Sequence, residues 1–190
     1  MSTSWENTTK VQGVRFTCGY CGALTSPREK YDYVRFDGHF HTVIAEIFIC
    51  PGCNSPTYKI DRKQIPGPLI GRNVRNLPEL INDLYRESRQ CFSVEAYTSS
   101  VLACRKLLMN IAVQEGAPEN KKFIEYVNFL EENNYTPPKG RQWVDKIRSK
   151  GNEATHEINP MTIEDARELL TFVELLLIYV YEFPSTVQSS

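Results

Sequence analysis

Two Cys-x-x-Cys pairs stand in the stretches Phe16-Thr17-Cys18-Gly19-Tyr20-Cys21-Gly22 and Ile49-Cys50-Pro51-Gly52-Cys53 of a 190-residue chain. A gap of two residues lets both thiolates of a pair reach one ion, while the amides between them point at the sulfur atoms. Two such pairs supply the four ligands of a tetrahedral site, which is the closed geometry of structural zinc. The sequence therefore predicts a zinc ion bound by Cys18, Cys21, Cys50 and Cys53. A closed site has no position for a substrate, so it indicates an architecture and not an activity.

The alternative for these four cysteines is a pair of disulfides. The spacing favours zinc, and free thiolate ligands indicate a reducing compartment. The polar start of the chain, residues 1–7, lacks the apolar run of a secretory signal. The most apolar run, residues 169–183, contains Glu174 and is too short to cross a bilayer. These features predict a cytoplasmic protein with no membrane contact.

A β-hairpin is expected between the two cysteine pairs. Strand-like runs at residues 31–36 and 40–49 flank Asp37-Gly38, a turn signal, and the second run leads directly into the second pair. Strands that deliver cysteines into tight turns are the construction of a zinc ribbon, which we expect at residues 13–60. Its core is small, so the metal is expected to supply much of its folding free energy. Residues 1–12 are expected to be frayed.

A linker rich in proline and glycine is expected next, within about residues 54–76, with residues 61–76 as its basic part. Two interpretations of its charge are open. It is either a solvated linker or a basic segment that follows a phosphate backbone, with Arg62 and Lys63 among the contacts. Residues 1–76 carry ten Lys and Arg against six Asp and Glu, whereas residues 77–190 carry twelve against seventeen. This difference in charge favours two domains.

From Leu77 onward the hydrophobic pattern becomes helical. Helices are predicted at about residues 78–91, 94–115, 119–132 and 162–181, with a shorter one before the last that carries Trp143, Val144 and Ile147. Ser93 is expected to start the second helix, and Thr162 with Asp165 forms the Thr-x-x-Asp signature of a capping box. Short connections make an antiparallel bundle the expected architecture of residues 77–183. The predicted fold class is therefore α+β, mainly α: a small four-cysteine zinc ribbon followed by a bundle of about five helices.

The stretch from Arg141 to Glu157 is the candidate for chemistry, because it joins basic residues to His156. Histidine titrates near neutral pH and can act as an acid or a base, while Arg148, Lys150 or Arg105 could neutralise phosphate charge. The alternative is structural, with Asn152 and His156 satisfying backbone groups in the turn before the last helix. The candidate contacts to nucleic acid are basic: Arg62, Lys63, Arg141, Lys146 and Lys150.

Two stretches carry a resemblance to a known family: Ala103-Cys104-Arg105-Lys106-Leu107-Leu108 and Ile147-Arg148-Ser149-Lys150-Gly151-Asn152-Glu153-Ala154-Thr155-His156. They resemble the Arg-containing second helix and the Arg-x-x-Gly-Asn-x-x-x-His signature of the bacterial domain-of-unknown-function 4145 family. That family is similar to the HEPN helical bundles, is often appended to restriction-endonuclease subunits and commonly follows a zinc ribbon. The resemblance implies a HEPN-like domain in a bacterial phage-defence or mobile-element context.

Many HEPN bundles are metal-independent RNases that work as dimers. The resemblance implies His156 as the catalytic histidine and Asn152 as the polar residue four positions before it. The arginine does not follow the pattern: Gly151 stands where an active RNase often has Arg, and Arg148 lies too far from His156. A binding module for nucleic acid or a protein partner is therefore the first hypothesis, with a HEPN-type RNase using His156 as the alternative.

A homodimer through the C-terminal helices is expected under either hypothesis. Residues 172–180 are apolar nearly all round the helix, which is more apolar surface than one side of a small bundle needs. The alternative is a central helix surrounded by its own neighbours.

Overall fold

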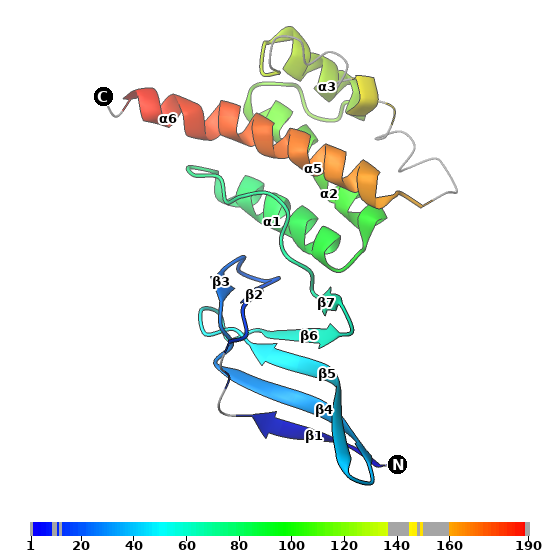
Figure 1. The fold of residues 1–190 in the computed structure, drawn as a ribbon. Helices are drawn as coiled ribbons and strands as arrows, with labels where there is room; N and C mark the ends of the chain where they lie inside the picture. The colour runs from blue at the N-terminus through cyan, green and yellow to red at the C-terminus, as the bar shows by residue number, and fades with distance from the viewer. Residues whose placement is uncertain are drawn as a thin grey trace. The chain divides into compact units, whose positions relative to one another are not determined.

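The computed structural model describes residues 2–8, 11, 13–136, 145–147, 149 and 160–188, with side chains except at 2–5, 8 and 186–188. The chain divides into two compact units, residues 1–69 and residues 70–190. Strands make up the first unit and helices dominate the second (Figure 1). The fold is therefore a mixed one of strands and helices.

The first unit is built on a five-stranded antiparallel sheet in the order β1-β4-β5-β6-β7 (Figure 1). The predicted strands and turn are present as β4 (Glu29–Asp37) and β5 (Phe40–Ile49), which pair as a hairpin. The remaining strands of this sheet are β1 (Ser2–Thr8), β6 (Pro56–Ile60) and β7 (Lys63–Ile65). A separate two-stranded pair joins β2 (Phe16–Thr17) to β3 (Leu24–Thr25).

This sheet is larger than the expected small ribbon. Residues 2–8, expected to be frayed, pair along β4 as β1. Residues 56–60 and 63–65, within the expected linker, form a second hairpin on the other side of β5. Both additions satisfy the backbone groups of strands that a lone β4–β5 hairpin would leave exposed. The pairing of β1 with β4 and of β6 with β5 therefore determined the structure of these residues. The prolines and glycines of residues 54–76 predict an irregular linker instead.

The second unit contains the helices α1 (Glu79–Ser93), α2 (Tyr97–Gln114), α3 (Phe123–Glu132) and α5 (Ile163–Leu177). A π-helix, η1 (Ile178–Glu182), continues α5 into α6 (Phe183–Gln188). The predicted capping box is confirmed, because the Asp165 amide donates to Thr162 Oγ1 and the Thr162 amide donates to Asp165 Oδ2. The predicted start of the second helix is wrong. Ser93 belongs to the last turn of α1, where its hydroxyl donates to the Gln90 carbonyl.

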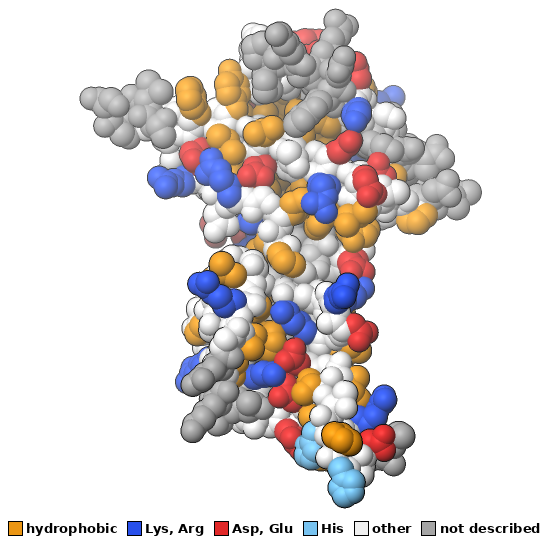
Figure 2. All heavy atoms as spheres, viewed as in Figure 1, with side chains coloured by type: hydrophobic (Ala, Val, Ile, Leu, Met, Phe, Trp, Pro, Cys, Tyr) orange, Lys and Arg blue, Asp and Glu red, His pale blue; other side chains and the backbone are white. Residues whose placement is uncertain are grey.

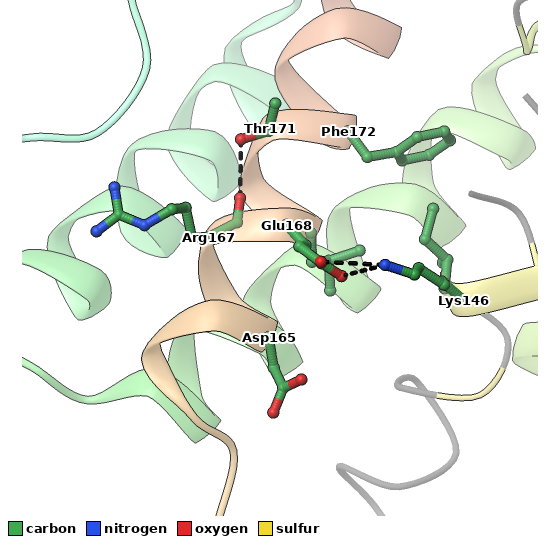
Figure 3. A pocket seen from close by; sticks show the side chains of 8 residues that line it. Lys146, Asp165, Arg167, Glu168, Thr171 and Phe172 are labelled. Carbon is green, nitrogen blue, oxygen red and sulfur yellow. Dashed lines mark hydrogen bonds and ion pairs between the residues drawn. The ribbon is translucent and has the colours of Figure 1, made fainter. Parts of the chain in front are cut away.

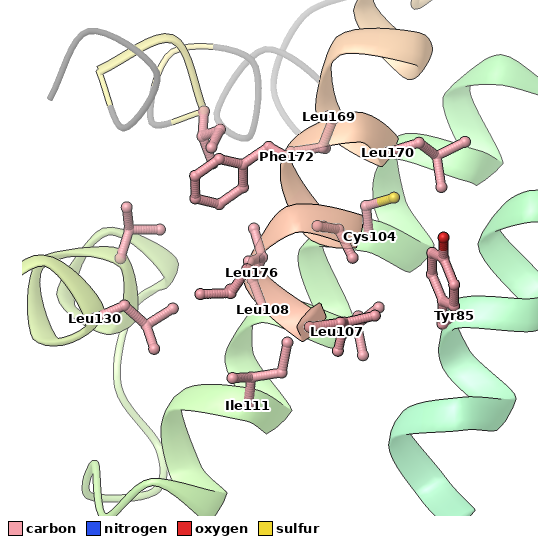
Figure 4. Packing of buried hydrophobic residues seen from close by; sticks show 14 of the residues in the cluster. Tyr85, Cys104, Leu107, Leu108, Ile111, Leu130, Leu169, Leu170, Phe172 and Leu176 are labelled. Atoms are coloured by element: carbon pink, nitrogen blue, oxygen red, sulfur yellow. The ribbon is translucent and has the colours of Figure 1, made fainter. Parts of the chain in front are cut away.

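The core of the second unit gathers around α2 (Figure 4). One wide face of this helix is buried, including Cys104, Leu107, Leu108 and Ile111. Side chains of α1, α3 and α5 close around it (Figure 4), and the Ser100 hydroxyl donates to the Ser88 carbonyl between α1 and α2. The expected antiparallel bundle remains a prediction, since the helices alone do not establish that arrangement.

A non-helical segment, Ile70–Asn76, which we call the connecting segment, is fixed to the helices by polar contacts. The Arg89 guanidinium of α1 donates to the Ile70 carbonyl, the Gly71 carbonyl and the Asn73 side chain at 2.7–2.8 Å. Glu182 of η1 accepts from the Arg72 guanidinium and from the Arg75 amide, and these contacts lower its pKa. The Arg72 guanidinium of the expected basic linker is therefore engaged within the protein, whereas Arg75 contributes its backbone amide.

Three large apolar side chains of the C-terminal helices are exposed, at intervals of four residues. Their exposed fractions are 44% for Leu175, 45% for Tyr179 and 60% for Phe183, whereas Phe172 and Leu176 are buried. The expected homodimer through these helices stays a prediction. Among the residues that the structure describes, no helix is long and apolar enough to span a membrane.

Candidate metal centre

The four predicted cysteine ligands converge in the first unit, where each pair forms the same type of tight turn. The amides of Cys18 and Cys50 donate to the carbonyls of Ala23 and Ser55, respectively. In the same way, the amides of Gly22 and Asn54 donate to the carbonyls of Cys18 and Cys50. Gly22 and Asn54, which follow the second cysteine of each pair, both have positive φ angles, of 73° and 56°. The two turns thus present their thiols in equivalent ways.

The cluster fits a metal ion bound by four thiolates. The four Sγ atoms lie within 4.8 Å of one another, with 3.6 Å between Cys18 and Cys53 and 3.7 Å between Cys21 and Cys50. A tetrahedral site with metal–sulfur bonds of about 2.3 Å requires sulfur atoms about 3.8 Å apart. Cys18 and Cys50 are buried, while Cys21 and Cys53 are exposed. A bound ion would therefore have two ligands in the small core of this unit and two at its surface.

The thiols of this cluster differ in how readily they ionise. Burial raises the pKa of Cys18 to about 12. Burial also acts to raise the pKa of Cys53, but hydrogen bonds from Ser55, together with those to Cys18 and Cys21, outweigh it and lower that pKa to about 7. Metal ligands must be deprotonated, so metal binding to this cluster releases protons and weakens as the pH falls. A cation at the centre would supply the charge that stabilises the buried Cys18 thiolate.

The first cysteine turn is held against the end of the second hairpin. The Gln64 side-chain amide donates to the Thr17 carbonyl at 2.8 Å and to the Pro66 carbonyl at 3.0 Å. Gly19 lies directly against this chain: a Cβ atom there would stand 2.6 Å from the carbonyl oxygens of both Pro66 and Gly67. Such distances are far below contact, and the atoms concerned are backbone, which cannot rotate away. Gly19 is therefore required by close packing and not by its backbone angles.

We expect Gly19→Ala to destabilise the first unit by about 1–3 kcal/mol, the usual cost of overpacking. Gly52→Ala is the matched control, because a Cβ at Gly52 meets only the Cys50 sulfur, at 3.8 Å. Chelator-induced loss of metal, followed with a colorimetric indicator, should be faster for Gly19→Ala and unchanged for Gly52→Ala. Equal rates for the two variants would show that the first turn does not pack on residues 66–67.

The two predicted nucleic-acid contacts of the expected linker lie on the second hairpin of the sheet. Arg62 is exposed in the turn between β6 and β7, and Lys63 is the exposed first residue of β7. Among the described side chains of the face shown in Figure 2, basic and acidic groups are interspersed.

Lys146, a third predicted contact, lies at a pocket of about 220 Å³ beside α5 (Figure 3). Its ammonium group pairs with Glu168 at 3.1 and 3.3 Å. The apolar residues that line this pocket, Ile147, Leu169 and Phe172, are all buried. The lining residues are Lys146, Ile147, Asp165, Arg167, Glu168, Leu169, Thr171 and Phe172.

Of the predicted catalytic residues, the structure describes Arg105 alone. Arg105 lies over the ring of Phe123, with its guanidinium carbon 4.3 Å from the ring centroid, and burial lowers its pKa. It therefore contacts α3 and does not line the pocket of Lys146. His156, Asn152, Arg148, Arg141 and Lys150 lie outside the residues that the structure describes.

A model of the family described as "Domain of unknown function (DUF4145)" matches residues 86–189, which is more than half of the chain. The chain belongs to this family. No curated protein and no solved structure matches the chain. The DUF4145 match begins inside α1, so the four cysteines and the whole sheet lie before it.

Sequence reasoning missed Arg89, a buried arginine inside the DUF4145 region that fixes the connecting segment just before it. Its exposed fraction is 6%, and its ring partner Tyr85 lies 5.1 Å from the guanidinium carbon. One signal was available. Ile81, Tyr85 and Arg89 follow one another at intervals of four residues, so they share the buried face of α1. An arginine on a buried face requires hydrogen-bond acceptors.

Proposed function

We propose that this DUF4145 protein is a binding module in which zinc, held by the four cysteines, folds a ribbon ahead of a HEPN-like helical bundle. The closed cluster carries the proposal. Four thiolates fill the coordination of a tetrahedral ion, so zinc there supplies folding free energy and has no position at which to activate water. The function of the first unit is then to present a surface.

Nucleic acid is the favoured ligand of this module, and a protein partner is the alternative. The exposed Arg62 and Lys63 project from the same hairpin of the sheet, next to one another in the chain. Adjacent exposed cations are the groups that contact phosphates without reading sequence. The resemblance of the helical part to defence-associated proteins fits a ligand of this class.

The test is binding of the zinc-loaded full chain to fluorescently labelled RNA and DNA at about 50 and 200 mM salt. We expect affinity to fall with salt, and the double variant Arg62→Ala/Lys63→Ala to reduce the slope of log K against log salt by about two. The control Lys121→Ala/Lys122→Ala removes two exposed lysines of the second unit and should leave the slope unchanged.

Two results would overturn the proposal. One is the absence of binding to any RNA or DNA at the lower salt concentration, which would leave a protein ligand. The other is RNA cleavage that persists in EDTA and is lost in His156→Ala, which would establish the HEPN-type RNase instead.

A further inference from the structure

The strand register of the first unit places aromatic and aliphatic residues in two rows on one face of the sheet. Tyr31, Ile47, Tyr58 and Ile65 are successive partners across β4, β5, β6 and β7. The next row contains Tyr33, Ala45, Ile60 and Lys63 in the same order of strands. Directly paired residues point to the same side of a sheet, so these side chains share a face, which we call the tyrosine face.

The tyrosine face lies opposite the hydrophobic cluster of the first unit. Among the residues at the alternating positions, which point the other way, Asp32, Phe48 and Thr57 are buried, and the charged or polar residues beside them, Lys30, Glu46, Lys59 and Gln64, are partly buried. Phe48 packs there against Phe16, with ring centroids 5.3 Å apart, beside the cysteine cluster. On the tyrosine face the three tyrosines are partly buried, Ile65 is 39% exposed, and the small Ala45 is buried among its neighbours.

The spacing of the three tyrosines suits flat ligands. Tyr31 and Tyr33 are two residues apart on one strand, or about 7 Å, and Tyr58 is two strands from Tyr31, or about 10 Å. The small Ala45 lies in the row of Tyr33, between that ring and Ile60. In RNA-binding sheets, outward aromatic side chains of this kind stack two or three unpaired bases.

Cationic groups lie on the same face at two of its sides. Arg35 follows Tyr33 by two residues on β4 and is exposed, and Lys63 ends the second row on β7. The acidic Glu29 on this face accepts a hydrogen bond from the Tyr31 hydroxyl at 3.0 Å. Aromatic rings flanked by cations match the bases and phosphates of a single strand, whereas a duplex keeps its bases stacked and presents phosphates only.

We infer that the tyrosine face binds single-stranded nucleic acid, with bases stacked on Tyr31, Tyr33 and Tyr58 and phosphates near Arg35 and Lys63. This inference rests on the proposed function: it names single-stranded nucleic acid as the class of ligand and the tyrosine face as the surface that binds it. It also accounts for the tyrosine and isoleucine residues that lie together in the two rows of this face.

The test uses fluorescence anisotropy of the zinc-loaded full chain with labelled oligo(U), oligo(dT) and a DNA duplex, each of about a dozen nucleotides per strand. The wild type should bind at least one single strand more tightly than the duplex. Tyr58→Ala should weaken that binding about 5- to 100-fold, the loss of one stacked base. Tyr58→Phe should stay within about twofold, because it keeps the ring.

Tyr20→Ala is the matched control. Tyr20 is an exposed tyrosine of the first cysteine turn and is not on the tyrosine face, so its loss should leave affinity unchanged. Zinc content and circular dichroism establish that each variant is folded. Unchanged affinity in a folded Tyr58→Ala variant would overturn the inference while the proposed function stands. No binding by the wild type to any of the three probes would overturn both.

Discussion

Cys18→Ser is expected to abolish stoichiometric zinc binding and to unfold the first unit. Cys18 is fully buried, and among the described residues its hydrophobic cluster contains Phe16, Phe48 and Cys50, with the partly buried Val14 packed against it. Structural zinc contributes about 10–16 kcal/mol of apparent binding free energy in small zinc domains, which is folding free energy when the apo form is unfolded. A cluster this small cannot replace that contribution.

Metal content and hydrogen exchange measure the two effects of Cys18→Ser separately. Zinc per chain should fall from about one to near zero, and amides of β4 and β5 should lose protection. The helices should keep theirs, since the second unit has a core of its own. Cys91→Ser is the control, because Cys91 belongs to α1 and not to the cluster. Retention of full zinc by Cys18→Ser would contradict a four-cysteine site.

Local chemistry made the metal cluster and the capping box predictable from the sequence. A Cys-x-x-Cys turn is specified within a few residues, and thiolate ligands have few other uses at that spacing. The Thr162–Asp165 box likewise needs only residues three apart. In each case the partners of a group lie next to it in the chain, so the pattern of residue types is sufficient.

Partners that are distant in the chain account for what the sequence did not predict. Residues 2–8 have no strong strand pattern and pair because β4 offers an edge. Ser93 has the chemistry of a helix start, but its hydroxyl finds an acceptor in α1, and α2 begins at Tyr97 instead. The tyrosine face was equally hidden, because Tyr58 joins Tyr31 only through the register of three strands.

Arg89 is the clearest case of a distant partner, and Arg89→Ala is expected to destabilise the second unit by roughly 2–4 kcal/mol. The substitution removes three short hydrogen bonds from a charged donor, at 2.7–2.8 Å, and leaves their acceptors in the connecting segment without that donor. Hydrogen bonds from a charged donor contribute about 1.5–3 kcal/mol each, and water replaces part of this loss because Gly71 and Asn73 are exposed. Equilibrium urea unfolding, followed by helical circular dichroism, measures the loss.

Arg86→Ala is the matched control on the same helix. Arg86 pairs with Asp83 at 3.0 Å at the surface, with both side chains more than half exposed, so its loss should change stability by no more than about 0.5 kcal/mol. Arg89→Lys should recover little, because a single ammonium group cannot serve three acceptors that the planar guanidinium reaches together.

Gly71→Ala tests the same connection without a change of charge. Gly71 has a φ angle of 74°, and a Cβ there would stand 2.6 Å from a Glu174 carboxylate oxygen and 2.7 Å from the Tyr85 hydroxyl. If the connecting segment is fixed as the hydrogen bonds indicate, both Gly71→Ala and Arg89→Ala lower the urea midpoint, and Arg86→Ala does not. A wild-type midpoint in Arg89→Ala would mean that the segment contributes nothing to the helical unit. In the wild type, water would then have to accept the hydrogen bonds of the Arg89 guanidinium. Arg89 is only 6% exposed beneath residues 70–73, which argues against such hydration.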